Sequence, residues 1–102
     1  MTYFIETFDK PNHQAARQAL RPAHLEFLQT HAARLLACGA KLNEDGSDAG
    51  GGVYIITAES EQDARAFIES DPFYAGDLFA EVRVTRWRKA YLDGVCHLPG
   101  AK

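Results

Sequence analysis

His24, in the segment RPAHLEFL, is the first residue to consider for chemistry. An imidazole gains and loses a proton near neutral pH, so a histidine beside a cleft can act as a general acid or base. The sequence predicts a helix over residues 22–38, because Pro22 suits a first helical turn and apolar residues then recur at helical spacing. His24 would lie in that first turn, where the positive end of the helix dipole favours the neutral base. The alternative is a structural histidine that caps the helix start or packs at the edge of the core.

Asp71, in the segment SDPFYAG, is the second candidate. A carboxylate can accept the second ring N–H of a histidine, fix its tautomer and raise its basicity. The structural alternative is an N-cap, since an aspartate followed by Pro72 is ordinary chemistry for a helix start. His24 and Asp71 both lie at predicted helix starts, so they can approach each other in space, although sequence spacing cannot show that they do.

Metal binding is not predicted. His31 lies two turns beyond His24, about 10 Å along a helix, which is too far for both rings to reach one ion. His13 and His97 lie in predicted loops without a partner pattern. Cys38 is expected to be a small buried apolar residue rather than a nucleophile. We therefore expect neither a metal nor a cofactor.

The last predicted strand is basic and carries Arg83, Arg86, Arg88 and Lys89. These residues could bind the anionic group of a substrate, or could keep an edge strand solvated and so discourage aggregation. Some RNA-binding domains share the order of strands and helices predicted below, but those domains are basic and carry paired aromatic motifs. This chain has a net charge of −3 and a sequence pI near 5.7, so no nucleic-acid partner is expected.

Length and composition predict one globular domain. The chain has 102 residues, of which 46% are hydrophobic and 25% charged, as is typical of a soluble protein. No apolar run approaches the roughly 20 residues that cross a bilayer, so no membrane association is expected. The two cysteines have neither metal nor redox spacing and no signal peptide is recognised, which predicts reduced thiols in a cytoplasmic protein.

Alternating strands and helices must position the two candidates. Apolar periodicity, turn residues and capping signals predict the elements. In order, these are a strand at 2–8, a polar lead-in or helical turn at 13–20, a helix at 22–38 that ends at Gly39, an edge strand at 40–43, a loop at 44–52, a strand at 53–58, a helix from the Ser60 cap to Glu69, a helical turn at 71–77, a strand at 79–89 and an irregular segment from Tyr91. The order βαββαβ predicts an α+β fold, with a four-stranded antiparallel sheet and two helices on one face.

One face of this sheet should remain open. The first and third strands should be central and are apolar on both faces, whereas the helices can cover only one face. The open face is expected to carry members of one apolar set, or their alternates along the strands: Tyr3, Ile5, Tyr54, Ile56 and Trp87. An exposed apolar face of this size usually marks an interface. We therefore predict a homodimer whose two sheets pack face to face.

Two motifs resemble those of the YCII-related (YciI-like) family. RPAHLEFL resembles the family's R-P-x-H-L pattern in its first helix, and SDPFYAGDLFAEVRVTRWR resembles its second motif, D-P-F/Y followed by an A-G-x-F stretch. The order of elements agrees over roughly residues 2–90. The resemblance implies a ferredoxin-like fold that dimerises through its sheet, as in the dimeric α–β barrel superfamily, and an active site of His24 and Asp71. It also implies a YCII-related domain at 1–92, followed by a C-terminal tail at 93–102.

The predicted function is that of a small cytosolic enzyme in which His24 and Asp71 perform acid–base chemistry on a small carboxylated or phenolic metabolite. Fold relatives implied by the resemblance include muconolactone isomerase-like and dehalogenating enzymes, so we expect isomerisation, elimination or dehalogenation. The alternative is a non-catalytic dimeric domain that binds a small ligand or a protein partner. The segment GAKLNEDG replaces the family's usual G-P-type turn after the first helix, so the substrate class stays open.

Overall fold

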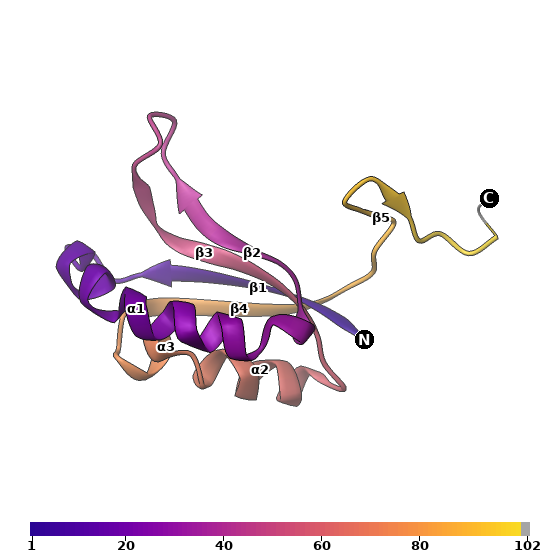
Figure 1. Ribbon diagram of the computed structural model, residues 1–102, viewed down its shortest axis with the longest axis horizontal. Coiled ribbons are helices and arrows are strands. Elements are labelled where there is room, and N and C mark those ends of the chain that lie inside the picture. The colour runs from indigo at the N-terminus through magenta and orange to yellow at the C-terminus, as the bar shows by residue number, and fades with distance from the viewer. Residues whose placement is uncertain (101–102) are drawn as a thin grey trace.

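A computed structural model describes residues 1–100 of the protein. Its main body is one four-stranded antiparallel sheet in the order β2-β3-β1-β4, with the helices on one face (Figure 1). The elements are β1 (Thr2–Asp9), α1 (Gln14–Thr30), the 3-10 turn η1 (Ala32–Arg34), β2 (Leu35–Leu42), β3 (Asp48–Thr57), α2 (Glu61–Glu69), α3 (Pro72–Ala75), β4 (Phe79–Trp87), β5 (Tyr91–Leu92) and β6 (Val95–Cys96). The predicted α+β, ferredoxin-like βαββαβ fold is confirmed, and the first and third strands are central as predicted.

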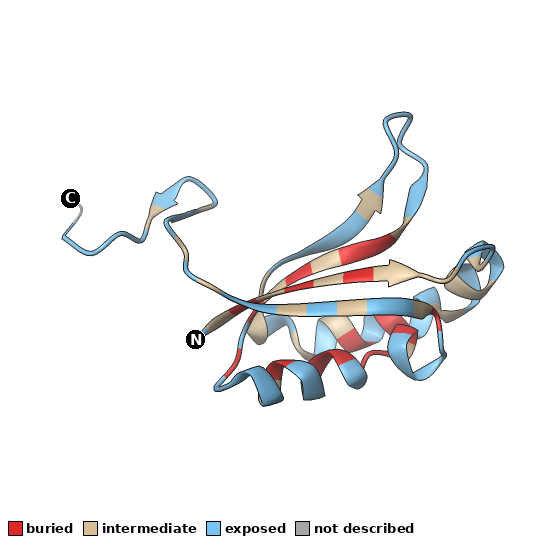
Figure 2. Cartoon of the chain, turned by 180° about the vertical axis from the view of Figure 1, so that it is seen from behind, coloured by how far each residue is buried: buried red, intermediate tan, exposed pale blue. Residues whose placement is uncertain are grey.

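The core lies between the sheet and the helices. Alternate side chains of β1 and β3 point to this side, and Figure 2 shows the buried residues gathered there. The core cluster comprises Tyr3, Ile5, Phe27, Tyr54, Ile56, Ala58, Ala64, Phe67 and Ile68. The helix α2 supplies the last three of these, as its apolar spacing predicts, and begins at Ser60, whose Oγ accepts the N–H of Asp63 at 3.0 Å.

The open face of the sheet carries the alternates of the predicted set. Tyr3, Ile5, Tyr54 and Ile56 face the helices and are buried. The register places five apolar residues on the other face, and all of them are half-buried: Phe4, Phe8, Val53, Ile55 and Trp87. Charged side chains share this face, since Lys41 Nζ lies 3.6 Å from the centroid of the Phe8 ring. The open face is therefore apolar at its centre and charged toward one end.

The predicted bounds of the first helix were wrong. The helix α1 begins at Gln14 and ends at Thr30, so Pro22 lies inside it rather than in its first turn. Residues 35–38 fit the apolar spacing of the predicted helix but belong to β2, and Gly39 lies within that strand rather than ending a helix. Pairing with β3 decides this, because the backbone hydrogen bonds of an edge strand outweigh a local helical preference. No helix within residues 1–100, α1 included, is long and apolar enough to span a membrane.

The hairpin of β2 and β3 is longer than predicted. The strand β3 begins at Asp48 and includes the glycines that the sequence assigned to a loop. At Gly51 the backbone has a φ of +146°, and a Cβ there would lie 2.1 Å from the backbone oxygen of Thr7. Glycine is therefore required for β3 to approach β1 at this position. Cys38, Gly39 and Ala40 of β2 lie at the same hollow as His24.

The chain leaves the sheet after Trp87. The predicted irregular segment contains a short hairpin, β5 with β6, which stands away from the main body (Figures 1 and 2). Tyr91 and Val95 on this hairpin are exposed. The predicted tail at 93–102 extends past the described residues, and its last two positions, 101 and 102, lie outside them.

Candidate active site

His24 lies in the middle of α1 and points toward the core. It follows the first helical residue, Gln14, by ten positions, which is about 15 Å of helix axis at 1.5 Å per residue. The predicted influence of the positive helix end on His24 was therefore wrong, because that influence fades within the first turn. His24 and Phe27 are the buried residues of α1, so the helix presents the imidazole to the protein interior rather than to its own end.

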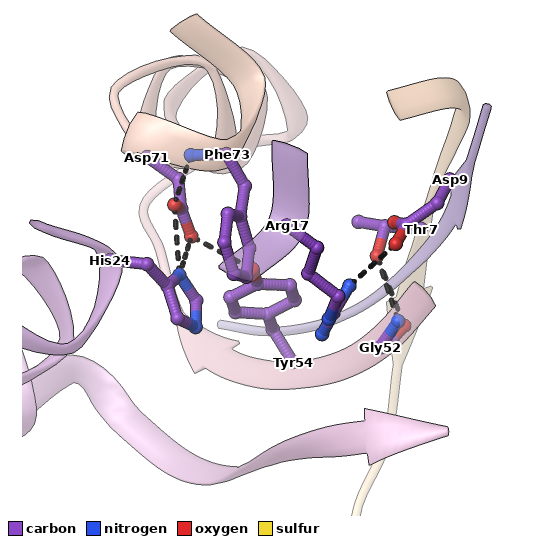
Figure 3. Close-up of polar contacts among 8 residues, drawn as sticks. All are labelled: Thr7, Asp9, Arg17, His24, Gly52, Tyr54, Asp71 and Phe73. Atoms are coloured by element: carbon purple, nitrogen blue, oxygen red, sulfur yellow. Dashed lines mark hydrogen bonds and ion pairs between the residues drawn. The ribbon is translucent and has the colours of Figure 1, made fainter. Parts of the chain in front are cut away.

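Asp71 meets His24 across 47 residues of sequence (Figure 3). His24 Nδ1 lies 2.9 Å from each carboxylate oxygen, Oδ1 and Oδ2. The same carboxylate caps α3, because Oδ1 accepts the backbone N–H of Phe73 at 2.8 Å. Asp71 thus has both roles that the sequence offered for it: it starts a helix and it contacts the ring.

Tyr54 is the third donor to Asp71. Its hydroxyl donates to Oδ2 at 2.8 Å from the central strand β3. Burial raises the pKa of the Tyr54 phenol far above its ordinary value, and the neighbouring negative charge of Asp71 adds to the effect. The phenol therefore remains a donor at neutral pH. Because Asp71 already accepts from Tyr54 and from Phe73, the hydrogen bond with His24 places a proton on Nδ1 and leaves Nε2 as the free nitrogen.

The free nitrogen, Nε2, lies on the side of the ring that faces away from Asp71 (Figure 3). His24 lines a cleft of about 280 Å³ between α1 and β2. No hydrogen bond within residues 1–100 uses Nε2, yet Nε2 is not fully buried, because Asp9 Oδ1 is the only fully buried side-chain nitrogen or oxygen there without a partner. Nε2 is therefore open to the cleft. The cleft is lined by Arg17, Arg21, His24, Leu25, Leu28, Cys38, Gly39, Ala40, Asp48 and Phe73. The arrangement is one buried acid, one oriented ring and one nitrogen directed at a small hollow.

Aromatic stacking fixes the plane of the imidazole. The ring of Phe73 lies parallel to that of His24, with 3.9 Å between centroids and an angle of 13° between planes. The guanidinium of Arg17 lies 4.7 Å from the centroid of the same Phe73 ring. Figure 3 shows Phe73 between His24 and Arg17. Rotation of the imidazole is therefore opposed both by the hydrogen bond to Asp71 and by the stacked phenyl ring.

Cys38 corrects one expectation of the sequence. It is exposed rather than buried, and it lies on β2 at the same cleft. The protein atoms around the cleft still desolvate its thiolate, which raises the pKa of the thiol to about 11, and the charge of Asp71 adds to the effect. A thiol with that pKa is almost fully protonated at neutral pH, so the expectation that Cys38 is not an activated nucleophile is consistent with its surroundings.

The remaining histidines do not reach the site. The His31 ring packs against Phe27, with 4.5 Å between centroids, and His13 Nδ1 lies 2.8 Å from the backbone oxygen of Pro11. His97 lies near the end of β4, in a separate hollow. Among the described residues, no three histidine, cysteine or acidic side chains lie close enough together to hold a metal ion.

The basic last strand also lies away from the cleft. Arg83 donates to Glu81 at 2.6 Å, while Arg86, Arg88 and Lys89 line the hollow that contains His97. None of the four lines the cleft beside His24. The strand β4 lies at the edge of the sheet, so its position agrees with the reading of these residues as charges on a solvated edge.

Tyr54 and the two arginines of α1, Arg17 and Arg21, were not predicted from the sequence as site residues. Tyr54 lies in the apolar segment VYIITA and was assigned only to a sheet face. The one available signal was that a buried phenol normally needs a hydrogen-bond partner, which raises the question of what Tyr54 bonds. Arg17 lies in the segment predicted as a polar lead-in, so its helical spacing from His24 could not be used.

Comparisons with known proteins show which family the chain resembles and which solved structure shares its fold. A family model described as the YCII-related domain matches residues 1–88. Protein YciI of Escherichia coli O6:H1 (strain CFT073) and Protein YciI of Shigella flexneri are each 33% identical over 98 residues, covering 89% of this chain and 100% of each relative. A solved structure of 5-chloro-2-hydroxyhydroquinone dehydrochlorinase (TftG) from Burkholderia phenoliruptrix AC1100, in complex with 2,5-dihydroxybenzoquinone, is 33% identical, with a TM-score of 0.79 over 86% of this chain and 94% of that chain.

Proposed function

The chain belongs to the YCII-related family, as its two motifs predict, and from that premise we propose that it is a small enzyme. In this proposal His24 and Asp71 carry out acid–base chemistry on a small carboxylated or phenolic compound. The reaction belongs to the isomerisation, elimination or dehalogenation type. The neighbouring structure supports this class, because its protein is a dehydrochlorinase bound to a hydroxyquinone and is 33% identical to this chain.

The orientation of His24 is the observation that carries the proposal. Its Nδ1 is held at 2.9 Å by a carboxylate with no exposed surface, while Nε2 is open to the cleft. A carboxylate that accepts from Nδ1 stabilises the positive charge that appears on the ring when Nε2 takes a proton. His24 is therefore the acid–base group and Asp71 is its positioning residue. Such help typically accelerates a reaction by about 10²–10⁴-fold.

An elimination at this site balances with one proton and one anion. A chlorinated dihydroxylated ring first takes its keto form, in which one hydroxyl has passed its proton to the chlorine-bearing carbon, so that chlorine lies on a saturated carbon next to a carbonyl. Nε2 then takes the proton of a second ring hydroxyl, whose oxygen becomes a carbonyl oxygen as the adjoining ring double bond shifts toward the chlorine-bearing carbon. The electron pair left behind forms the new double bond, and chloride leaves with the electrons of the broken C–Cl bond. The proton on Nε2 then passes to water, which restores the base. The net change is loss of HCl, and no oxidant or reductant is required.

The test is turnover by paired variants. We expect the wild-type protein to release chloride from 5-chloro-2-hydroxyhydroquinone, measured by ion chromatography, and His24→Asn to reduce the rate by about 10²–10⁴-fold. Asp71→Asn should also lower the rate, and His97→Asn, outside the cleft, should leave it unchanged. Thermal melting of His24→Asn near the wild-type temperature would exclude loss of folding as the cause.

A chain without turnover would point to the alternative function. If the wild-type protein releases no chloride and converts none of a panel of hydroxylated and carboxylated rings, the enzymatic proposal is wrong. The protein would then be a non-catalytic binding domain, in which the contact between His24 and Asp71 only joins α1 to α3. In that case His24→Asn should change stability or ligand affinity.

The open face of the sheet supports a homodimer in this proposal. Phe4, Val53 and Ile55 are apolar side chains on central strands, with no helix above them. A second copy would bury them by packing its own open face against this one. Sedimentation velocity should give a dimer for the wild-type protein and a monomer for Ile55→Asp. Tyr74→Asp, on α3 at the helix side, should remain a dimer.

The proposal places the protein in the cytoplasm. Both cysteines, Cys38 and Cys96, are free thiols rather than a disulfide, as is usual in reducing compartments. Fractionation of cells that express a tagged chain should recover it with cytoplasmic markers. Recovery from the periplasm or the medium would contradict this placement.

A further inference from the structure

Two arginines share the helix face that carries His24. Arg17, Arg21 and His24 follow one another at intervals of four and three residues along α1, so they form one row on the helix surface. All three line the same cleft. The row therefore brings guanidinium groups to the same hollow as the free nitrogen of His24.

The guanidinium of Arg17 already has partners within the protein. Its Nη1 donates to Asp9 Oδ2 at 2.8 Å, and the side chains of Arg17 and Asp9 are only 12% and 6% exposed. The guanidinium also lies over the ring of Phe73. The charge of Arg17 is thus balanced by Asp9 and its position is fixed. Its function is to hold Phe73, and through Phe73 the plane of the imidazole.

The guanidinium of Arg21 has no such partner within residues 1–100. It is exposed, and within residues 1–100 no carboxylate lies within 4.0 Å of its guanidinium nitrogens and no hydrogen bond uses them. Asp48 also lines the cleft, but it is exposed and forms an ion pair with neither arginine. Arg21 therefore presents a full set of N–H donors and an unbalanced positive charge to the cleft, next to the ring.

The rest of the cleft is suited to a small apolar ring. Leu25, Leu28 and Phe73 line it from the helix side, and Gly39 and Ala40 line it from β2. A volume of about 280 Å³ is at the small end of ligand sites. Arg21 and His24 are three residues apart on α1, so their side chains are neighbours on the helix surface, and both line this cleft. A single ring can therefore reach both residues at once.

We infer that Arg21 is the anion-binding and specificity-determining residue of this cleft, and that it selects a single flat ring or unsaturated acid with an ionised oxygen. The inference rests on the proposed function, because it places the ionised oxygen on Arg21 and the reacting atom at His24 Nε2. A planar guanidinium matches two adjacent oxygens of a carboxylate or a hydroxyquinone with two parallel hydrogen bonds. Neutral rings of the same shape would leave Arg21 without that partner.

A pair of matched probes tests this inference by binding alone. 2,5-Dihydroxybenzoquinone has acidic hydroxyls that are ionised at neutral pH, whereas 2,5-dimethoxybenzoquinone keeps the ring and carries no charge. By titration calorimetry, we expect the wild-type protein to bind the ionised probe at least about tenfold more tightly than the neutral probe. Arg21→Met should weaken binding of the ionised probe by about 10- to 100-fold and leave the neutral probe unchanged.

Two further variants separate charge from shape. Arg21→Lys keeps the charge without the planar fork, so it should recover only part of the loss. Arg88→Met removes an exposed arginine outside the cleft and should change neither affinity. The inference is overturned if the wild-type protein fails to bind the ionised probe at millimolar concentration, or if Arg21→Met still distinguishes the two probes.

These experiments distinguish failure of the anion site at Arg21 from failure of the proposed enzymatic function. If the probes are distinguished through Arg21 but no substrate is turned over, the anion site stands and the enzymatic proposal fails. If chloride release depends on His24 while Arg21→Met binds the ionised probe as the wild-type protein does, the enzymatic proposal stands and the anion site fails.

Discussion

The Tyr54→Phe substitution removes a single hydroxyl and tests how much its hydrogen bond to the buried Asp71 carboxylate stabilises the fold. In the native protein this hydroxyl donates to Asp71 Oδ2 at 2.8 Å. A hydrogen bond to a charged group contributes about 1.5–3 kcal/mol, and Asp71 keeps its bonds from His24 and Phe73 in the variant. We expect the free energy of unfolding of Tyr54→Phe to be lower than that of the wild-type protein by about 2 kcal/mol at neutral pH.

This difference should shrink in alkali. Burial, and second the charge of Asp71, raise the pKa of Tyr54 well above the ordinary 10.0 of a phenol. Above about pH 10 the unfolded chain releases the phenol proton while the folded chain keeps it, so stability falls as pH rises. The slope is about 1.4 kcal/mol per pH unit for one proton. The wild-type advantage of about 2 kcal/mol should therefore vanish near pH 11.5.

Urea unfolding at a series of pH values, followed by circular dichroism, measures the difference between the two proteins. Titration of lysines and of Cys38 affects both proteins alike and largely cancels. Tyr91→Phe is the matched control, because Tyr91 is 60% exposed and its substitution should give no pH-dependent difference. A difference between Tyr54→Phe and the wild-type protein that stays constant up to about pH 11.5 would refute the reasoning, since the folded phenol would then ionise at its ordinary pKa.

Three other perturbations follow from the structure. Below pH 9, Cys38 should react with iodoacetamide about 100-fold more slowly than a thiol of pKa 9.0, because its pKa is about 11; the rate is measured with the other cysteine changed to serine. Gly51→Ala should lower the free energy of unfolding by at least about 1–3 kcal/mol, since the new Cβ would meet a backbone oxygen of β1 at 2.1 Å, whereas Gly39→Ala has open space and should cost less than about 1 kcal/mol in urea unfolding. Arg17→Met should destabilise by about 3–5 kcal/mol because it strands the buried charge of Asp9, and adding Asp9→Asn should recover part of the loss.

Each of these has a clear contrary result. Fast alkylation of Cys38 at neutral pH would show that its thiolate is stabilised rather than desolvated. Equal stabilities of Gly51→Ala and Gly39→Ala would show that β3 does not need to approach β1 closely. A single Arg17→Met variant as stable as the wild-type protein would show that Asp9 is not held by an ion pair.

Local signals in the sequence predicted where α2 and α3 begin. Ser60 and Asp71 were both predicted as N-caps, and both side chains accept a backbone N–H of the following turn. A cap depends on residues within two or three positions, so it can be predicted without knowledge of the fold. For the same reason the sequence alone predicts Asp71 at the start of α3.

The extent of α1, and which face of the sheet the helices cover, could not be predicted from local signals. Leu35 and Leu36 suit a helical stripe and a strand equally well, and pairing of β2 with β3 decides between them. Alternation along β3 showed that Tyr54 and Val53 lie on opposite faces but not which face the helices cover. The bond from Tyr54 to Asp71 joins a strand to a distant cap, so no local pattern could predict it.

The contact between His24 and Asp71 makes the site a property of the closed fold rather than of any segment. The ring arrives with α1, the acid arrives with the turn before α3, and the long hairpin lies between them in the chain. A polypeptide cut within that hairpin would give two pieces, one with His24 and the other with Asp71. Transplanting either motif into another scaffold should therefore transfer none of the reactivity. Any movement of α1 away from α3 should break the contact between His24 and Asp71, and so end the reactivity, before the sheet itself unfolds.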